Sequence, residues 1–228
     1  MIAENLQIIK EKIDKKCGFC GRGGDEITLI AVSKTQPVSA INDVFNAGIV
    51  NFGENKPQEL KSKSEIITAP LKWHMIGHLQ TNKVKYIIDC AEYIHSVDSI
   101  KLAEEINLRA AKAGKIQKIL LEVNTSGEDS KFGLKDKNDI LSIANFCENS
   151  GSLNLCGLMT MAPFTDNEEV IRDCFGKAKN LFEWLKGEGF GITELSMGMT
   201  NDFEIAIEEG ATMLRIGTAI FGERNYLI

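Results

Sequence analysis

The chain has 228 residues, of which 43% are hydrophobic and 25% charged, so it holds enough apolar material for the core of one globular domain. Its formal net charge is -6 and its pI about 5.3, and a field of this sign argues against nucleic acid and anionic lipid as partners. No Pro/Gly/Ser-rich linker, charge block or low-complexity stretch divides the sequence. We therefore expect one domain over residues 1–228.

The N-terminal segment has the pattern of an amphipathic helix. Apolar residues recur on one helical face, at Ile2, Leu6, Ile9 and Ile13. A signal peptide would instead need an uncharged apolar core behind a basic start, and no apolar run nears the roughly 20 residues that span a bilayer. We expect a cytoplasmic protein with no membrane partner.

Six cysteines are scattered through a chain too long to depend on disulfides, so reduced thiols are expected. Cys17 and Cys20 have the C-x-x-C spacing of a redox couple or of half a zinc site. No second such pair exists and the three histidines lie far away in sequence. The pattern therefore favours a surface turn between the first helix and the first strand, and we predict no metal site.

Short apolar, β-branched runs alternate with helical patterns along the rest of the chain. The first strand is expected over 27–32, and helical periodicity from Val38 to Phe45 follows it and ends at Gly48. Further helices are predicted near 99–113 and 167–186, and a last one from Ala219 onward. Seven more strands are predicted, near residues 49–52, 71–76, 93–96, 117–124, 153–158, 193–197 and 212–216.

Eight strand-then-helix units after an initial helix predict an α/β fold, a (β/α)8 TIM barrel with an extra N-terminal helix. The alternative is an open doubly wound sheet. That architecture usually carries a glycine fingerprint after its first strand, whereas residues 33–37 contain no glycine.

The carboxyl ends of barrel strands form the active site of this fold, so the residues there are the candidates. They are Lys34, residues 53–55, His74, Gly77, Asn124, Met159, Met161, residues 196–200 and residues 215–218. Lys34 directly follows a buried strand, where burial would leave a nucleophilic amine able to condense with an aldehyde. The alternative is a lysine that extends out of the barrel mouth into solvent.

Glycines after strands 7 and 8 predict a phosphate site. Gly198, Gly217 and Thr218 would expose backbone N–H groups, with the hydroxyl of Ser196 as a further donor. Arg215, within strand 8, needs a hydrogen-bond acceptor, which is either a ligand or a buried ion pair with Glu54 or Glu194. Together with Lys34, these residues describe a site for a small aldehyde that carries a phosphate.

Several motifs resemble those of the YggS/PROSC family of proteins that bind pyridoxal 5′-phosphate (PLP). They are AVSKTQP (31–37), FGEN (52–55), WHMIGHLQTNK (73–83), EDSKFG (128–133), GLMTM (157–161), LSMGMT (195–200) and RIGTAIFG (215–222). The resemblance runs over nearly the whole chain. Two residues depart from the pattern: Thr200 stands where serine is expected, and Gln36 where a basic residue is common.

The resemblance implies a barrel like the N-terminal domain of alanine racemase, which is PLP fold type III. It implies that Lys34 forms a Schiff base with PLP as an internal aldimine and that Arg215 faces the pyridine nitrogen. It further implies that phosphate is held by Ser196, Gly217 and Thr218. Asn55 and Met159 would lie near the ring, although methionines at such positions also serve as core filler. His74 is left outside this set, as a core residue or a general acid.

An arginine at the ring nitrogen makes PLP a weak electron sink, because its charge disfavours a pyridinium. No residues follow the eighth unit to build a second catalytic face. We therefore expect a monomer of PLP homeostasis that stores, buffers or transfers PLP, with PLP-dependent apo-enzymes as candidate partners and Lys131 as a candidate accepting amine. The alternatives are a PLP-dependent amino-acid racemase and a class I aldolase that uses Lys34 without PLP.

Overall fold

The computed structural model describes residues 2–128 and 131–222. Eight parallel strands follow one another around a closed barrel, in the order β1 to β8. They are β1 (Thr28–Val32), β2 (Asn51–Glu54), β3 (Lys72–Met75), β4 (Ala91–Val97), β5 (Gln117–Glu122), β6 (Leu153–Met159), β7 (Glu194–Ser196) and β8 (Met213–Ile216). All eight predicted strands are present, so the predicted barrel is confirmed.

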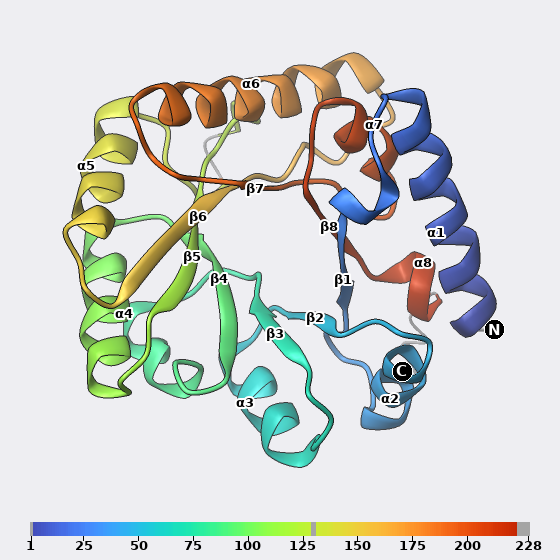
Figure 1. Cartoon of the computed structure of the whole chain (residues 1–228), viewed down its shortest axis with the longest axis horizontal. Coiled ribbons are helices and arrows are strands. Elements are labelled where there is room, and N and C mark those ends of the chain that lie inside the picture. The colour runs from blue at the N-terminus through green and yellow to red at the C-terminus, as the bar shows by residue number, and fades with distance from the viewer. Residues whose placement is uncertain (1, 129–130, 223–228) are drawn as a thin grey trace.

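Helices surround the barrel, as Figure 1 shows in a view down the short axis of the molecule. They are α1 (Ile2–Phe19), α2 (Val38–Asn46), α3 (Pro57–Ile66), α4 (Ile100–Lys112), α5 (Lys137–Glu148), α6 (Glu168–Gly187), α7 (Phe203–Glu208) and α8 (Thr218–Phe221). Two 3-10 helices, η1 (Gly24–Glu26) and η2 (Thr81–Tyr86), complete the elements. The unit after β3 thus carries a 3-10 helix where an α-helix was expected.

The first and last strands close the barrel. β1 pairs in parallel with both β2 and β8, and Ala31 lies opposite Ile216 across the closing seam. The chain therefore brings residues from its two ends into one hydrogen-bonded sheet, which places Lys34 after β1 beside Gly217 after β8. The helix predicted from Ala219 onward is present as α8, Thr218–Phe221, and the rest of the predicted segment, beyond Gly222, lies outside the described residues.

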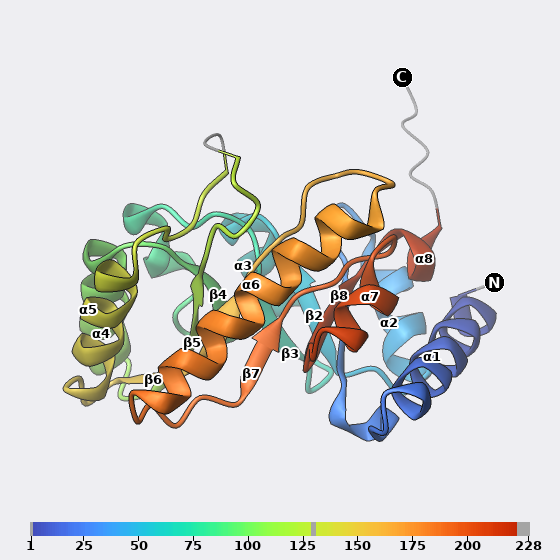
Figure 2. The same cartoon turned by 90° about the horizontal axis from the view of Figure 1, so that it is seen from above.

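The amphipathic N-terminal helix is confirmed and runs to Phe19. Its apolar face, which includes Leu6, Ile9, Ile13 and Cys17, is buried. Figure 2 shows α1 on the outside of the barrel, where it packs against α2, α7 and α8. The predicted turn at the C-x-x-C pair is wrong for its first cysteine, because Cys17 is buried in the last turn of α1 while Cys20 is exposed.

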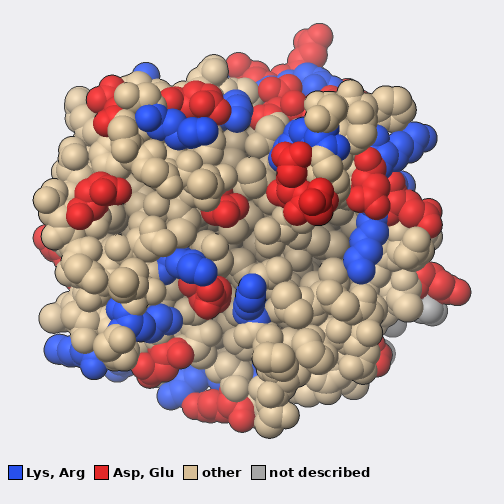
Figure 3. Space-filling model, in the orientation of Figure 1, with Lys and Arg blue, Asp and Glu red and all other residues tan. Residues whose placement is uncertain are grey.

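Apolar packing occurs in two layers. The larger lies between strands and helices, and a smaller cluster inside the barrel holds Ile30, Leu120, Cys156, Met159 and Met213. The interior also holds buried polar side chains, which is where the site begins. On the face seen in Figure 3, acidic and basic side chains are interspersed. None of the described helices has the length and apolar character needed to cross a bilayer.

Candidate functional site

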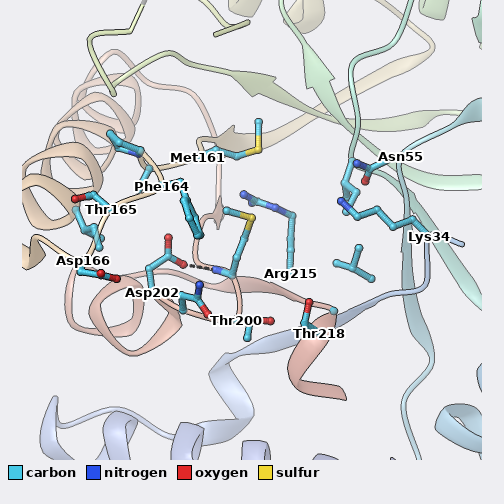
Figure 4. Close-up of a pocket in the computed structure, with 18 of the residues that line it drawn as sticks. Lys34, Asn55, Met161, Phe164, Thr165, Asp166, Thr200, Asp202, Arg215 and Thr218 are labelled. Atoms are coloured by element: carbon cyan, nitrogen blue, oxygen red, sulfur yellow. Dashed lines mark hydrogen bonds between the residues drawn. The ribbon is translucent and has the colours of Figure 1, made fainter. Parts of the chain in front are cut away.

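A pocket of about 290 Å³ opens at the carboxyl ends of the strands. Its walls come from the segments after β1, β2, β6, β7 and β8. They include Lys34, Gln36, Asn55, Met161, Phe164, Asp166, Thr200, Asp202, Arg215, Gly217 and Thr218. In Figure 4, Lys34 and Asn55 project from one side, Phe164 and Asp202 lie on the other, and Arg215 lies between. The volume suits one small aromatic molecule.

Lys34 lies in a tight turn directly after β1, and it is half-buried. The next residue, Thr35, has a left-handed backbone with φ of 65°. Such a conformation is unfavourable for a β-branched residue and persists only where its surroundings hold it. The turn that carries the predicted nucleophile is therefore held by contacts from outside itself.

Those contacts come from a buried ion network on β2 and α3. The Lys63 ammonium donates to the Ser33 carbonyl oxygen at 2.7 Å, to Glu54 Oε1 at 2.8 Å and to Glu59 Oε1 at 2.7 Å. Glu59 Oε1 also accepts from the Thr35 backbone N–H at 2.6 Å, and Ser33 Oγ donates to Glu54 Oε1 at 2.6 Å. Burial raises the pKa of Glu54, against the hydrogen bonds from Lys63 and Ser33. The network fixes the turn on both sides of Lys34.

This network was not predicted from the sequence. The sequence placed Glu54 among the strand-end candidates and as an ion-pair partner of Arg215, and it gave no role to Lys63. A signal was present, since Glu59 and Lys63 lie four residues apart on a helix that follows the FGEN motif.

Asn55 reaches the pocket because two loops pack closely. A Cβ at Gly77, after β3, would lie 2.4 Å from the Asn55 carbonyl oxygen and 2.8 Å from its Cα. Only glycine lets the loop after β3 lie directly on the backbone of Asn55. The glycine of the WHMIGH motif thus positions a residue of the FGEN motif.

Arg215 is buried in β8, and it also lines the pocket. Its Nη1 donates to Ser196 Oγ at 2.6 Å and its Nη2 to the Thr160 carbonyl oxygen at 2.8 Å. The considered ion pairs are not formed, since Glu54 binds Lys63 and the Glu194 carboxylate accepts from Thr212 Oγ1. Burial lowers the pKa of Arg215 to about 10, so it remains a cation at neutral pH. A guanidinium has five N–H donors, and these two bonds leave others for a ligand.

The predicted phosphate loops meet on the same wall. Gly217 is the residue before α8, and it brings no side chain to cap the amides of the first helical turn. A Cβ there would approach the Val32 carbonyl oxygen and Cβ to 3.3 Å. Thr200 Oγ1 lies beside the same turn and accepts from the Ala219 N–H at 3.4 Å. Backbone N–H groups at such a turn can hold an anion.

Five of the seven predicted site residues line the pocket: Lys34, Asn55, Arg215, Gly217 and Thr218. Met159 and Ser196 do not, because both are completely buried behind its wall. Met159 packs in the barrel interior against Ile30 and Leu120, whereas Met161, two residues nearer the mouth, reaches the pocket.

Lys131 does not line the pocket. Its ammonium donates to the Ala162 carbonyl oxygen at 3.1 Å and pairs with Glu128. Ala162 itself belongs to the pocket wall, so Lys131 lies just outside it. Among residues 2–128 and 131–222, no cluster of three or more His, Cys, Asp or Glu side chains could hold a metal ion.

A family model described as "Alanine racemase, N-terminal domain" matches residues 2–225. Two relatives named "Pyridoxal phosphate homeostasis protein" match almost end to end. The protein of Aquifex aeolicus (strain VF5) is 42% identical over 225 residues, which cover 98% of each chain. That of Escherichia coli (strain K12) is 38% identical over 232 residues, covering 99% of this chain and 97% of the relative.

Solved structures agree with this picture. PipY of Synechococcus elongatus PCC7942, with PLP bound, has a TM-score of 0.84 and 32% identity, covering 97% of this chain and 100% of PipY. Alanine racemase of Clostridium difficile 630 has a TM-score of 0.78 and 16% identity, covering 98% of this chain and 58% of the racemase. At that identity the racemase shows the shared barrel fold alone.

Proposed function

The chain belongs to the family of the alanine racemase N-terminal domain, as its motifs predicted, and within this family we propose that it is a PLP-binding protein of PLP homeostasis whose cofactor is bonded to Lys34. One observation carries this assignment. Three groups line a single small pocket. They are the amine of Lys34, after β1, the buried guanidinium of Arg215, on β8, and the glycine-threonine turn of residues 217–218, after β8.

Each part of PLP has a counterpart in this pocket. The Lys34 amine would bond to the aldehyde carbon. The amides of Gly217 and Thr218, and the hydroxyls of Thr218 and Thr200, would hold the phosphate. Arg215 would donate a hydrogen bond to the ring nitrogen. No side chain of Gly217 caps the first turn of α8, and the Thr200 and Thr218 hydroxyls line the same pocket as Lys34 and Arg215, so the residues present fit the cofactor.

When bound, PLP supplies an electron sink, which is strongest when its ring nitrogen is protonated. Arg215 is itself a cation with a pKa of about 10, so it would donate to the ring nitrogen and would disfavour a second positive charge there. The ion network under Ser33 and Thr35 keeps Lys34 in place. These residues favour retention of PLP over turnover, and a racemase function is not favoured.

We extend the proposal to the setting of the protein. Residues 1–228 would act as one PLP-binding domain, a monomer of the cytoplasm that passes PLP to PLP-dependent apo-enzymes. Pairing of β1 with β8 supports the single domain, because it joins the two ends of the chain. The position of Lys131 beside the pocket wall supports its role as an accepting amine.

The decisive experiment is a spectrum of the purified protein with PLP, before and after borohydride reduction, followed by peptide mass mapping. We expect a visible band and a reduced adduct on Lys34, both absent in Lys34→Ala. Lys61→Ala, an exposed lysine of α3, serves as the control and should keep the adduct. An adduct of equal yield in Lys34→Ala would overturn the proposal.

Two further assays address transfer and turnover. PLP release to an apo-enzyme is timed for native protein and Lys131→Ala, and an unchanged rate would remove Lys131 from the transfer. Chiral analysis after incubation with L-alanine and other amino acids tests racemisation. We expect no sustained change of chirality.

A further inference from the structure

A chain of hydrogen bonds runs through the barrel interior behind Arg215. Its members come from β8, β7, β4, β3 and β2. Beyond the bond from Arg215 to Ser196, the Ser196 hydroxyl lies 3.1 Å from His95 Nδ1. His95 Nε2 lies 2.9 Å from His74 Nδ1, and His74 Nε2 lies 3.1 Å from Asn51 Oδ1. We call Asn51, His74, His95 and Ser196 the histidine chain.

The Asn51 amide oxygen at the end of the chain can only accept, so His74 donates to it from Nε2. A neutral His74 then accepts on Nδ1 from His95 Nε2, and a neutral His95 accepts on Nδ1 from the Ser196 hydroxyl. Ser196 Oγ in turn accepts from Arg215, which can only donate. This arrangement requires both rings to be neutral.

The surroundings keep the two imidazoles neutral. Both side chains are completely buried, and burial lowers the pKa of His74 to about 3 and that of His95 well below its ordinary value. Positive charges nearby act in the same direction, from Lys72 and Lys118 on His74 and from Arg215 on His95. Tyr93 stacks on His74 with ring centroids 4.9 Å apart and an interplanar angle of 4°, which holds the ring plane.

Burying two histidines inside a barrel carries a desolvation cost that apolar side chains would not have. Buried polar groups stabilise a protein only when their partners are all in place, and apolar side chains of similar size would avoid that condition. Here the chain leads from the wall of the PLP pocket to Asn51, the first residue of β2, at the opposite end of the barrel. One residue of the pocket wall, Arg215, donates a side-chain hydrogen bond to this histidine chain, through Ser196.

We propose that the histidine chain positions Arg215: it orients the Ser196 oxygen to accept from Nη1 and so holds the guanidinium toward the pocket. The inference rests on the proposed function for the identity of the ligand. His95 and His74 are positioning residues and not catalytic ones. The Ser196 hydrogen is committed to His95, so Ser196 serves as an acceptor for Arg215 and not as a donor to phosphate.

The first test needs no substitution and no ligand. Long-range proton–nitrogen NMR spectra of the native protein at pH 7 report which ring nitrogen carries the proton. We expect both buried histidines to be neutral and protonated on Nε2, with assignments from His74→Gln and His95→Gln. Protonation of either ring on Nδ1 would reverse the chain and overturn the proposal.

The second test removes the Asn51 end of the histidine chain and measures the effect on ligand binding in the pocket. Two probes are used in binding titrations, pyridoxine 5′-phosphate, which has the ring nitrogen, and benzyl phosphate, which lacks it. Asn51→Leu removes the terminal acceptor. We expect it to weaken pyridoxine 5′-phosphate about tenfold, the effect of disturbing one hydrogen bond to a charged group, and to leave benzyl phosphate unchanged.

Two variants complete the design. Asn51→Asp retains an accepting oxygen and should keep the preference for pyridoxine 5′-phosphate over benzyl phosphate. Asn154→Leu makes the same change at an exposed position of β6 and should leave the binding of both probes unchanged. An unchanged probe ratio in folded Asn51→Leu would overturn the positioning role. Failure of both probes to bind the native protein would instead count against the proposed function, so the two failures are distinguishable.

Discussion

Lys63 is a lysine that acts as a structural cation in this protein. Its ammonium is buried, it pairs with Glu54 and Glu59, and it also holds the carbonyl of the residue before Lys34. A buried pair of this kind has a large effect when one partner is removed, because the other is left as an uncompensated charge.

Lys63→Met is expected to lower the free energy of unfolding by about 3–5 kcal/mol, since it strands Glu54 and releases the Ser33 carbonyl. Urea denaturation measures the change. Lys61→Met, on the same helix, removes an exposed lysine paired with Glu65 and should cost under about 1 kcal/mol. Equal losses in the two variants would show that Lys63 does not hold the turn.

Glu122, at the end of β5, is a second buried charge with a measurable consequence. It is 4% exposed, and its Oε2 has no hydrogen-bond partner among the described residues. Burial raises its pKa to about 7, assisted by Asp98 and opposed by Arg215. Because the folded-state pKa exceeds the ordinary value of 4.5, the stability from this group is complete below pH 4.5 and is lost as pH rises through 7.

Glu122→Gln removes this loss. The free energy of unfolding of the variant minus that of the native protein should therefore increase between pH 5 and pH 8. The slope reaches at most about 1.4 kcal/mol per pH unit. Urea denaturation at both pH values measures it. In Glu183→Gln the difference should stay constant, because the pKa of Glu183 is lowered by its hydrogen bond from Lys179 and its effect lies below pH 4.5. A falling difference for Glu122→Gln would contradict the raised pKa.

At the scale of elements, a bulge in β6 adjusts one strand to both of its neighbours. Ile119 of β5 lies opposite Leu155, but the next residue, Leu120, lies opposite Gly157, so Cys156 is the extra residue. A Cβ at Gly157 would lie 1.7 Å from the Glu194 carbonyl oxygen on β7. The bulge therefore depends on a glycine, as strands with close backbone approach commonly do.

Gly157→Ala should destabilise the protein by about 1–3 kcal/mol, because the methyl group forces β6 and β7 apart. Thermal unfolding followed by circular dichroism measures the loss. Gly151→Ala is the matched control, since no atom lies within 4 Å of its added Cβ. If Gly157→Ala were as stable as Gly151→Ala, the close approach of β6 to β7 at Gly157 would not require glycine.

At the scale of the whole molecule, closure of the barrel joins segments from both ends of the chain. Each strand has two neighbours and β1 pairs with β8, so no strand can leave without breaking two ladders. We expect the described barrel to unfold as one cooperative unit, which is also what the proposed single domain requires.

The two tryptophans report on different parts of the molecule, Trp73 on β3 and Trp184 on α6. In Trp73→Phe and in Trp184→Phe, the remaining tryptophan should show a urea midpoint that coincides with that of far-UV circular dichroism. Separate midpoints within one variant would indicate parts that unfold independently.

Sequence patterns alone predicted the barrel and most of its strand ends, although β2 runs to Glu54, two residues beyond its predicted end. Apolar periodicity is a local signal, and in this fold polar residues at strand ends converge on one mouth, so Lys34, Asn55, Arg215 and residues 217–218 were correctly brought to one pocket. The covalent bond from Lys34 to PLP remains a prediction.

Tertiary structure alone decided which of these residues reach the pocket and what holds them. Met159 and Met161 differ only in depth along the barrel, and depth depends on strand tilt and stagger. His95 and Ser196 meet across 101 residues of sequence, and Lys63 reaches Ser33 across 30. No periodicity encodes such contacts, because they arise only when the closed sheet brings distant strands to the same level.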